Sequence, residues 1–102
     1  MAEAKTVRTL EDIRRLRPQI MELARQYRAR KVSVFGSIVR GEMHADSDID
    51  FLVDFEEVYS LLDHTGLLVG LEDLLGCKVD VVPRTALRPF LRDAVISEAQ
   101  EL

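Results

Sequence analysis

Two aspartates separated by one residue, Asp48 and Asp50, follow the pair Gly36-Ser37 at an interval of ten residues. The segment before the Gly-Ser pair is apolar and β-branched, which predicts a strand that turns into a short helix. A glycine at such a turn lets another group approach the backbone closely, and the exposed amides with the Ser37 hydroxyl are suited to a phosphate group. Arg40 lies one helical turn further on and would add a positive charge.

The aspartates open a segment that predicts a strand over Ile49 to Phe55. Because side chains alternate across a strand, both carboxylates point to one side with Cα atoms about 7 Å apart, and both can reach one pair of hard cations. Asp80 offers a third carboxylate inside an apolar segment, where an unpaired charge would be costly to bury.

Two Mg²⁺ ions held by Asp48, Asp50 and Asp80 would stabilise both the attacking and the leaving oxygen of an in-line phosphoryl displacement. Asp80 could also help to deprotonate the incoming hydroxyl. The pattern therefore predicts nucleotidyl transfer. Pairs of acidic residues at strand starts also occur as solvated edges or as ion-pair partners, here of Arg40, but the spacing from the Gly-Ser pair favours the catalytic interpretation. The lone histidines His44 and His64 are interpreted as surface or loop groups that bind no metal, and Cys77 as a small buried residue.

The first helical segment is ambiguous. Apolar residues recur at three and four positions from Thr9 to about Arg30, which is helical spacing. Pro18 lies inside this segment and removes a backbone donor, so the segment is either one kinked helix or two helices.

The remaining elements alternate helix and strand with short connections. The fold class is α+β with α/β-like alternation: a small mixed sheet of about three strands flanked by helices. The predicted elements are strands over Lys31–Phe35, Ile49–Phe55 and Lys78–Val82, a short helix after Gly36, a helix over Ser60–Leu75 ended by Gly76, and a last helix from Thr85 onward, weakened by Pro89.

Length and charge restrict the possible classes of protein. The 102 residues predict a single domain over 1–102 with one core, and leave no room for a second module. The net charge of −4 argues against binding duplex nucleic acid by phosphate neutralisation alone. A single cysteine, no export signal and no long apolar stretch predict a cytoplasmic protein that does not enter a membrane.

Taken together, these motifs resemble the signature of the DNA polymerase beta-type nucleotidyltransferase superfamily. The match is closer still to its minimal nucleotidyltransferase (MNT) group, whose pattern is GSx10DxD. The segments that carry the resemblance are Phe35-Gly36-Ser37, Arg40-Gly41-Glu42, Ser47-Asp48-Ile49-Asp50 and Val79-Asp80-Val81-Val82. With the flanking helices they cover nearly the whole chain.

The resemblance implies a role for each matching residue. Gly36 and Ser37 would contact the triphosphate of ATP, and Arg40 and Ser47 would line the nucleotide pocket. The two acids of the DxD pair and the later strand acid would bind Mg²⁺; these are Asp48, Asp50 and Asp80.

The resemblance also implies a partner. Members of this size are commonly paired with a HEPN-domain ribonuclease as antitoxin and toxin, and are thought to silence it by transferring AMP from ATP to a tyrosine hydroxyl. A hetero-oligomer with such a toxin fits a chain too short for an acceptor-binding domain, and an acidic surface would complement a basic RNA-cleaving protein. Two alternatives remain: an antitoxin that acts by binding only, and a free-standing nucleotidyltransferase acting on a small molecule or an RNA end.

Overall fold

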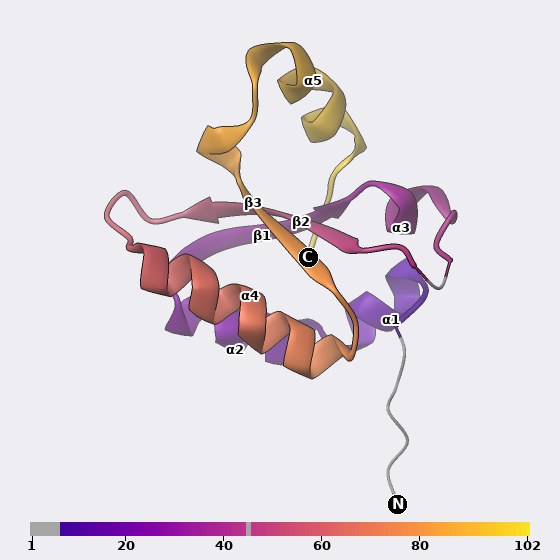
Figure 1. The fold of residues 1–102 in the computed structure, drawn as a ribbon, viewed down its shortest axis with the longest axis horizontal. Coiled ribbons are helices and arrows are strands. Elements are labelled where there is room, and N and C mark those ends of the chain that lie inside the picture. The colour runs from indigo at the N-terminus through magenta and orange to yellow at the C-terminus, as the bar shows by residue number, and fades with distance from the viewer. Residues whose placement is uncertain (1–6, 45) are drawn as a thin grey trace, which may run out of the picture.

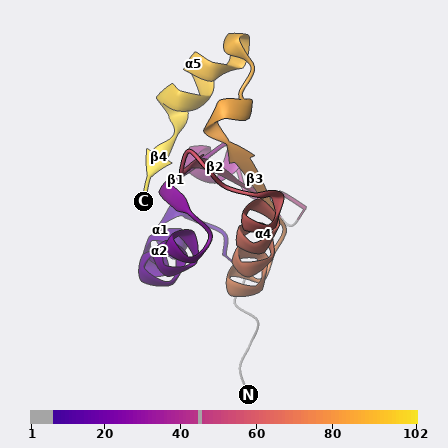
Figure 2. The same ribbon diagram turned by 90° about the vertical axis from the view of Figure 1, so that its left-hand side faces the viewer.

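The computed structural model describes residues 7–44 and 46–102, which form a mixed four-stranded sheet with helices on one face and a separate helical segment on the other (Figures 1 and 2). The elements in chain order are α1 (Leu10–Arg15), α2 (Arg17–Gln26), β1 (Ala29–Phe35), α3 (Ser37–Arg40), β2 (Ile49–Phe55), α4 (Leu61–Leu75), β3 (Val79–Pro83), the 3-10 helix η1 (Arg84–Ala86), α5 (Pro89–Glu98) and β4 (Gln100–Glu101). The α+β class is confirmed.

The sheet has the strand order β3-β2-β1-β4. Strand β1 is antiparallel to both β2 and β4, whereas β2 and β3 are parallel. The crossover from β2 to β3 runs through α4, as parallel neighbours require. The prediction of about three strands missed β4, because two polar residues at a sheet edge carry no strand pattern.

The first helical segment is two helices. Helix α1 begins with a capping box in which the Thr9 side chain accepts from the Asp12 amide and the Asp12 side chain accepts from the Thr9 amide. The chain leaves helical geometry at Leu16, and Pro18 then lies in the first turn of α2. A proline is tolerated there because the amide it lacks would have no partner inside the helix.

The last predicted helix is wrong at its start. Thr85 lies in the short 3-10 helix η1, and α5 begins at Pro89. Arg88 has the extended backbone that the residue before a proline prefers, so Pro89 separates two elements. Strands β1 and β3 also differ at their ends from the predicted ranges: β1 begins two residues earlier, and β3 is displaced by one residue.

The core lies between one face of the sheet and helices α2 and α4 (Figure 2). Ile49, Phe51 and Val53 of β2 point into it and are fully buried, as the alternation along this strand predicts. The helices approach closely through glycines: a Cβ on Gly66 would lie 2.3 Å from the Tyr27 ring. The helices thus cover one face of the sheet, and the alternate residues of β2 point to the other face.

No helix in 7–44 or 46–102 combines the length and the apolar character needed to cross a membrane.

Candidate active site

The sheet brings together carboxylates that are distant in sequence. Asp50 of β2 is paired directly with Asp80 of β3 in the parallel register, so their Cα atoms are about 5 Å apart. Their neighbours Phe51 and Val81 are buried against the helices, so the two aspartates point to the opposite, open face of the sheet. Asp48 immediately precedes β2 and lies two residues from Asp50.

The burial of these aspartates differs from what the sequence predicts for Asp80. Asp80 is exposed, as is Asp48, and Asp50 is half-buried. The expectation that Asp80 would need compensation for burial is therefore wrong: β3 is an edge strand, and the open face leaves its central residue in water. The burial cost falls on Asp50 instead.

The electrostatics of the site show an excess of negative charge around Asp50. Burial is the main cause that raises the pKa of Asp50, and the carboxylates of Asp80 and then Asp48 raise it further. The Arg40 guanidinium opposes this increase only in part. A divalent cation would relieve the same repulsion, because it adds positive charge beside oxygen ligands.

The donor set fits Mg²⁺ in one specific way. Within the described part of the chain, no group of three His, Cys, Asp or Glu side chains forms a ready-made metal cage. Mg²⁺ in nucleotide-dependent enzymes is usually held by one or two carboxylates together with substrate phosphates and water. The neighbouring carboxylates of Asp50 and Asp80 suit that arrangement, in which the substrate completes the coordination.

Gly36 lies directly against Asp50. Its backbone has φ +81° and ψ −150°, a region that only glycine adopts readily. A Cβ at this position would also come within 2.4 Å of Asp50 Oδ2. The glycine of the Gly-Ser turn is therefore required twice, by its own conformation and by the carboxylate packed on it.

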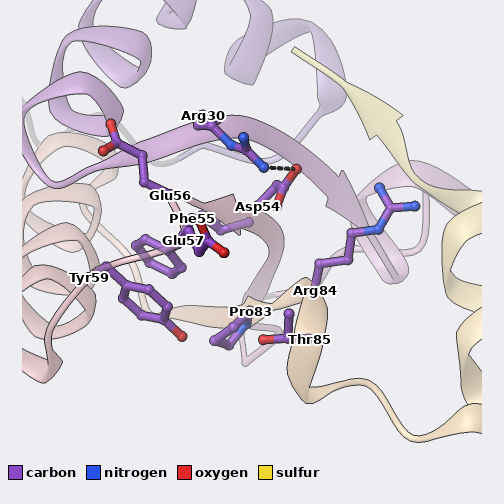
Figure 3. Close-up of a pocket in the computed structure, with 10 residues that line it drawn as sticks. Arg30, Asp54, Phe55, Glu56, Glu57, Tyr59, Pro83, Arg84 and Thr85 are labelled. Carbon is purple, nitrogen blue, oxygen red and sulfur yellow. Dashed lines mark ion pairs between the residues drawn. The ribbon is translucent and has the colours of Figure 1, made fainter.

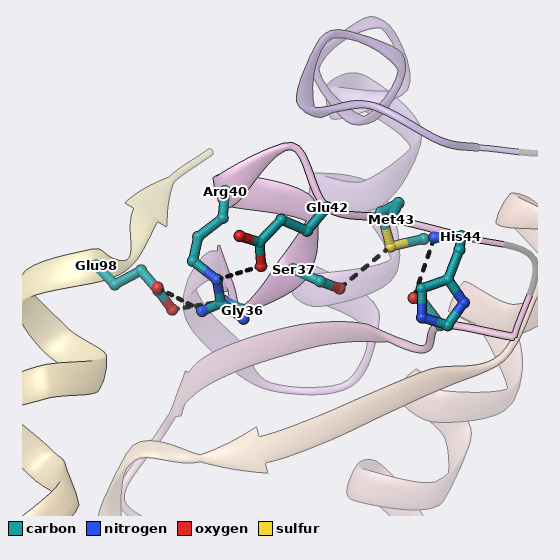
Figure 4. Close-up of polar contacts among 8 residues, drawn as sticks. Gly36, Ser37, Arg40, Glu42, Met43, His44 and Glu98 are labelled. Carbon is teal, nitrogen blue, oxygen red and sulfur yellow. Dashed lines mark hydrogen bonds and ion pairs between the residues drawn. The ribbon is translucent and has the colours of Figure 1, made fainter.

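The carboxylate of Glu98, near the far end of the chain, accepts hydrogen bonds from the Gly36 amide and from Arg40 (Figure 4). The Gly36 amide donates to Glu98 Oε1 at 2.8 Å, and Arg40 Nη1 donates to Glu98 Oε2 at 2.7 Å. Arg40 Nε also donates to Glu42 at 2.9 Å. Among the described residues, the ion pairs of Arg40 are thus with these two glutamates and not with the aspartates of the DxD pair.

The two predicted serines make hydrogen bonds of their own. Ser37 is half-buried, and its hydroxyl donates weakly to the Met43 sulfur at 3.5 Å (Figure 4). Ser47 closes the turn before β2, where its hydroxyl accepts from the His44 amide at 3.1 Å. Ser47 and Asp48 line a cavity of about 350 Å³ together with the half-buried Cys77.

His64 is half-buried in α4 and not in a loop, and Cys77 is half-buried where the sequence predicts a buried residue. His64 Nε2 lies 3.0 Å from the Val81 carbonyl oxygen, which ties α4 to β3. Burial raises the pKa of the Cys77 thiol, and Glu72 and Asp48 raise it further. Such a thiol is a poor nucleophile near neutral pH.

A second cavity lies at the other end of β2 (Figure 3). It has a volume of about 450 Å³, and its described lining includes Tyr59, Asp54 and the ion-paired Arg30. None of the predicted site residues is part of that lining. Tyr59 stacks on Phe55 with ring centroids 4.2 Å apart, so the apolar side of this cavity is already packed.

Sequence reasoning missed Glu98. It is separated from Gly36 by 62 residues and from Arg40 by 58, and it belongs to no pattern shared with them. The only sequence signal was an acidic residue at the end of an amphipathic segment, which is typical of many exposed helices.

Comparison with known proteins shows what the chain as a whole resembles. The nucleotidyltransferase domain family matches residues 13–102. The chain is 45% identical over 91 residues to the protein adenylyltransferase MntA of Thermococcus cleftensis, covering 88% of this chain and 92% of that protein. A minimal nucleotidyltransferase of known structure is 47% identical with a TM-score of 0.83, over 92% of this chain and 96% of that chain.

A more distant structural relative is the MNT antitoxin of Shewanella oneidensis, solved in complex with a tri-AMPylated HEPN toxin. It is 20% identical with a TM-score of 0.64, over 86% of this chain and 69% of that chain. This likeness shows a shared fold.

Proposed function

Because the chain belongs to the nucleotidyltransferase domain family, we propose that it is a Mg²⁺-dependent protein adenylyltransferase that transfers AMP from ATP to a tyrosine hydroxyl of a HEPN toxin. The observation that carries this proposal is the placement of Asp50, which is opposite Asp80 and in contact with Gly36. That contact joins the two halves of the GSx10DxD pattern in space. The 45% identity to a protein adenylyltransferase supports the same chemistry.

The nucleotide would lie on the open face of the sheet. The Gly36 amide, the Ser37 hydroxyl and the Arg40 guanidinium would hold the phosphate groups, since they belong to the turn and short helix that begin at Gly36, which packs against Asp50. Ser47 would support the pocket from the turn that precedes the DxD pair. Asp48, Asp50 and Asp80 would hold Mg²⁺, which supplies positive charge to the phosphate oxygens as the bond to the leaving group breaks.

The reaction forms one bond and breaks one. The tyrosine oxygen attacks the α-phosphorus of ATP, the bond from that phosphorus to the bridging oxygen of the β-phosphate breaks, and pyrophosphate leaves. The tyrosine proton needs an acceptor, and the carboxylate of Asp80, which is exposed and opposite Asp50, would help to receive it. The protein contributes mainly alignment and charge, as phosphoryl transfer requires.

The acceptor tyrosine would be presented by the toxin. On the open side of the sheet lies α5, no residue of which is buried. A toxin that docks beside the open face would bring its own tyrosine, and the pair would form a hetero-oligomer. Neutralisation would follow from the covalent AMP group.

Incubation of the toxin with this chain, ATP and Mg²⁺, followed by mass spectrometry of the toxin, tests the proposal. We expect adenylyl groups on a tyrosine, and we expect Asp50→Asn to reduce the transfer rate by at least about a hundredfold because it removes a metal ligand. Asp54→Asn is the matched control. Asp54 lies on the same strand and the same face but pairs with Arg30 at 3.6 Å, outside the site.

Two outcomes would contradict the proposal. If the toxin gains no AMP, yet Asp50→Asn still protects cells from it, the chain acts by binding only. If the chain consumes ATP on a small hydroxylated molecule or an RNA end without the toxin, it is a free-standing nucleotidyltransferase.

A further inference from the structure

We propose that Glu98 is a built-in competitor of the nucleotide phosphates: in the nucleotide-free chain its carboxylate occupies the donors that ATP must use, and ATP binding displaces it. This inference rests on the proposed function, because it assigns Gly36 and Arg40 to the phosphates. It adds a contact that would regulate nucleotide binding and that is made by Glu98, a residue outside the predicted active site.

The first support is geometric. One oxygen of Glu98 accepts from the Gly36 amide at 2.8 Å, and the other accepts from Arg40 Nη1 at 2.7 Å. A phosphate group offers the same feature, two anionic oxygens that accept from a backbone amide and a guanidinium. Figure 4 shows the carboxylate directed at both donors from the end of α5. Glu98 and a phosphate cannot fill these positions together.

The second support is the charge state. The hydrogen bonds from Arg40 and from the Gly36 amide lower the pKa of Glu98, so the group is an anion at neutral pH. Its charge also contributes to the raised pKa of Asp50. The chain thus holds an anion beside its own acidic cluster, which is favourable only because the two donors attract anions strongly enough to offset that repulsion.

The third support is the weak attachment of the element that carries Glu98. Figures 1 and 2 show α5 on the side of the sheet opposite α2 and α4. No residue of α5, which the structure describes in full, is buried, and Phe90 is 75% exposed. Displacing Glu98 would therefore expose little additional apolar surface.

The limit of this movement is set by β4. Two residues after Glu98 the chain pairs with β1, through Val34 opposite Gln100 and Ser33 opposite Glu101. The side chain of Glu98 and the end of α5 can shift while β4 stays paired. The displaced segment would then remain next to the active site.

The test compares the full chain with Glu98→Gln, which keeps the size of the side chain and removes its charge. Calorimetric titration with a non-hydrolysable ATP analogue and Mg²⁺ should show about tenfold tighter binding by Glu98→Gln, if Glu98 occupies the donors about nine-tenths of the time. Inorganic triphosphate should gain as much, because the competition concerns phosphate groups alone. Glu101→Gln is the control, since it removes the same charge from an exposed residue of β4.

A second variant and a second measurement guard against a folding defect. Glu98→Asp keeps the charge but shortens the side chain, so it should reach the two donors poorly and also bind the analogue more tightly. Hydrogen exchange in residues 89–98 should become faster when the analogue binds to the unmodified chain.

Equal or weaker binding by both Glu98 variants overturns the inference, because Glu98 would then be a structural tie or a nucleotide ligand. If the unmodified chain nevertheless transfers AMP to the toxin, the proposed function stands without it. If Glu98→Gln binds the analogue tightly but no AMP is transferred, the competition is supported and the proposed function fails.

Discussion

At the scale of single residues, Asp50 is the point at which stability and function oppose each other. Burial and two neighbouring carboxylates raise its pKa. A carboxyl whose pKa is higher in the folded than in the unfolded state costs stability once the pH exceeds the unfolded value. The proposed function accounts for this cost, since the same negative charge would hold the metal of a metal-bound nucleotide.

Asp50→Asn should therefore stabilise the metal-free chain at neutral pH, although we expect it to slow AMP transfer by at least about a hundredfold. We expect the melting temperature at about pH 7 to rise by up to about 4 °C, since solvent screens a half-exposed charge. The difference should vanish near about pH 3, where the carboxyl is protonated in both states. Thermal denaturation followed by circular dichroism across this pH range measures the effect.

Asp54→Asn again provides the control, because Asp54 pairs with Arg30 and gains no stability from losing its charge. A melting temperature that falls for Asp50→Asn at neutral pH would show that the carboxylate is already compensated by groups of the protein.

At the scale of elements, the glycines of α4 determine how closely two helices cover the sheet. A Cβ on Gly66 would lie 2.3 Å from Tyr27 Cε1, whereas a Cβ on Gly70 would lie 2.9 Å from the mobile end of Leu23. Both positions lie inside a helix, where alanine is intrinsically favoured over glycine by about 1 kcal/mol. The packing contact therefore decides the sign of each substitution.

Gly66→Ala should destabilise the chain by about 1 kcal/mol, because overpacking costs about 1–3 kcal/mol and helix propensity returns part of it. Gly70→Ala should be close to neutral, since the Leu23 side chain can rotate away. Urea denaturation of both variants checks the difference. Equal stabilities for the two would mean that the Tyr27 ring also moves without cost.

Several elements could be predicted because local sequence determines them. Strand β2 alternates so regularly from Ile49 to Phe55 that its limits and its buried face are confirmed. The 3-10 helix before Pro89 was missed because a proline preceded by apolar spacing is compatible with either a kink or a break.

In the candidate site, too, some features are determined by local sequence and others are not. Spacing alone predicts that Asp48 and Asp50 lie on one face, and the apolar sequence around Asp80 predicts that it lies in a strand. The parallel pairing that places Asp80 opposite Asp50 depends on the crossover through α4, and the contact of Glu98 depends on the return of the chain through β4. Neither of these long-range arrangements is encoded in a local pattern.

At the scale of the whole molecule, the net charge predicts how the chain would approach the proposed partner. The chain carries a net charge of −4, and the exposed Asp48 and Asp80 place part of its negative charge on the open face of the sheet. An acidic surface attracts a basic partner over distances longer than a contact, and this attraction is screened by salt.

The association rate with a basic HEPN toxin should fall about tenfold between about 50 mM and about 500 mM NaCl. The dissociation rate should change much less, because it depends on short-range contacts. Surface plasmon resonance at several salt concentrations measures both. A salt-independent association rate would show that apolar contacts, and not charge, select the partner.

The pleat of β2 separates two kinds of evolutionary constraint within seven residues. The inward positions must stay apolar for the chain to fold, whereas Asp50 on the outward face is not part of the core and would serve the proposed reaction. Mutations that erase the acids would leave the shape intact. A gene copy whose product has lost its activity in this way could still be retained by selection for binding the toxin. Related proteins without the acids need not be non-functional.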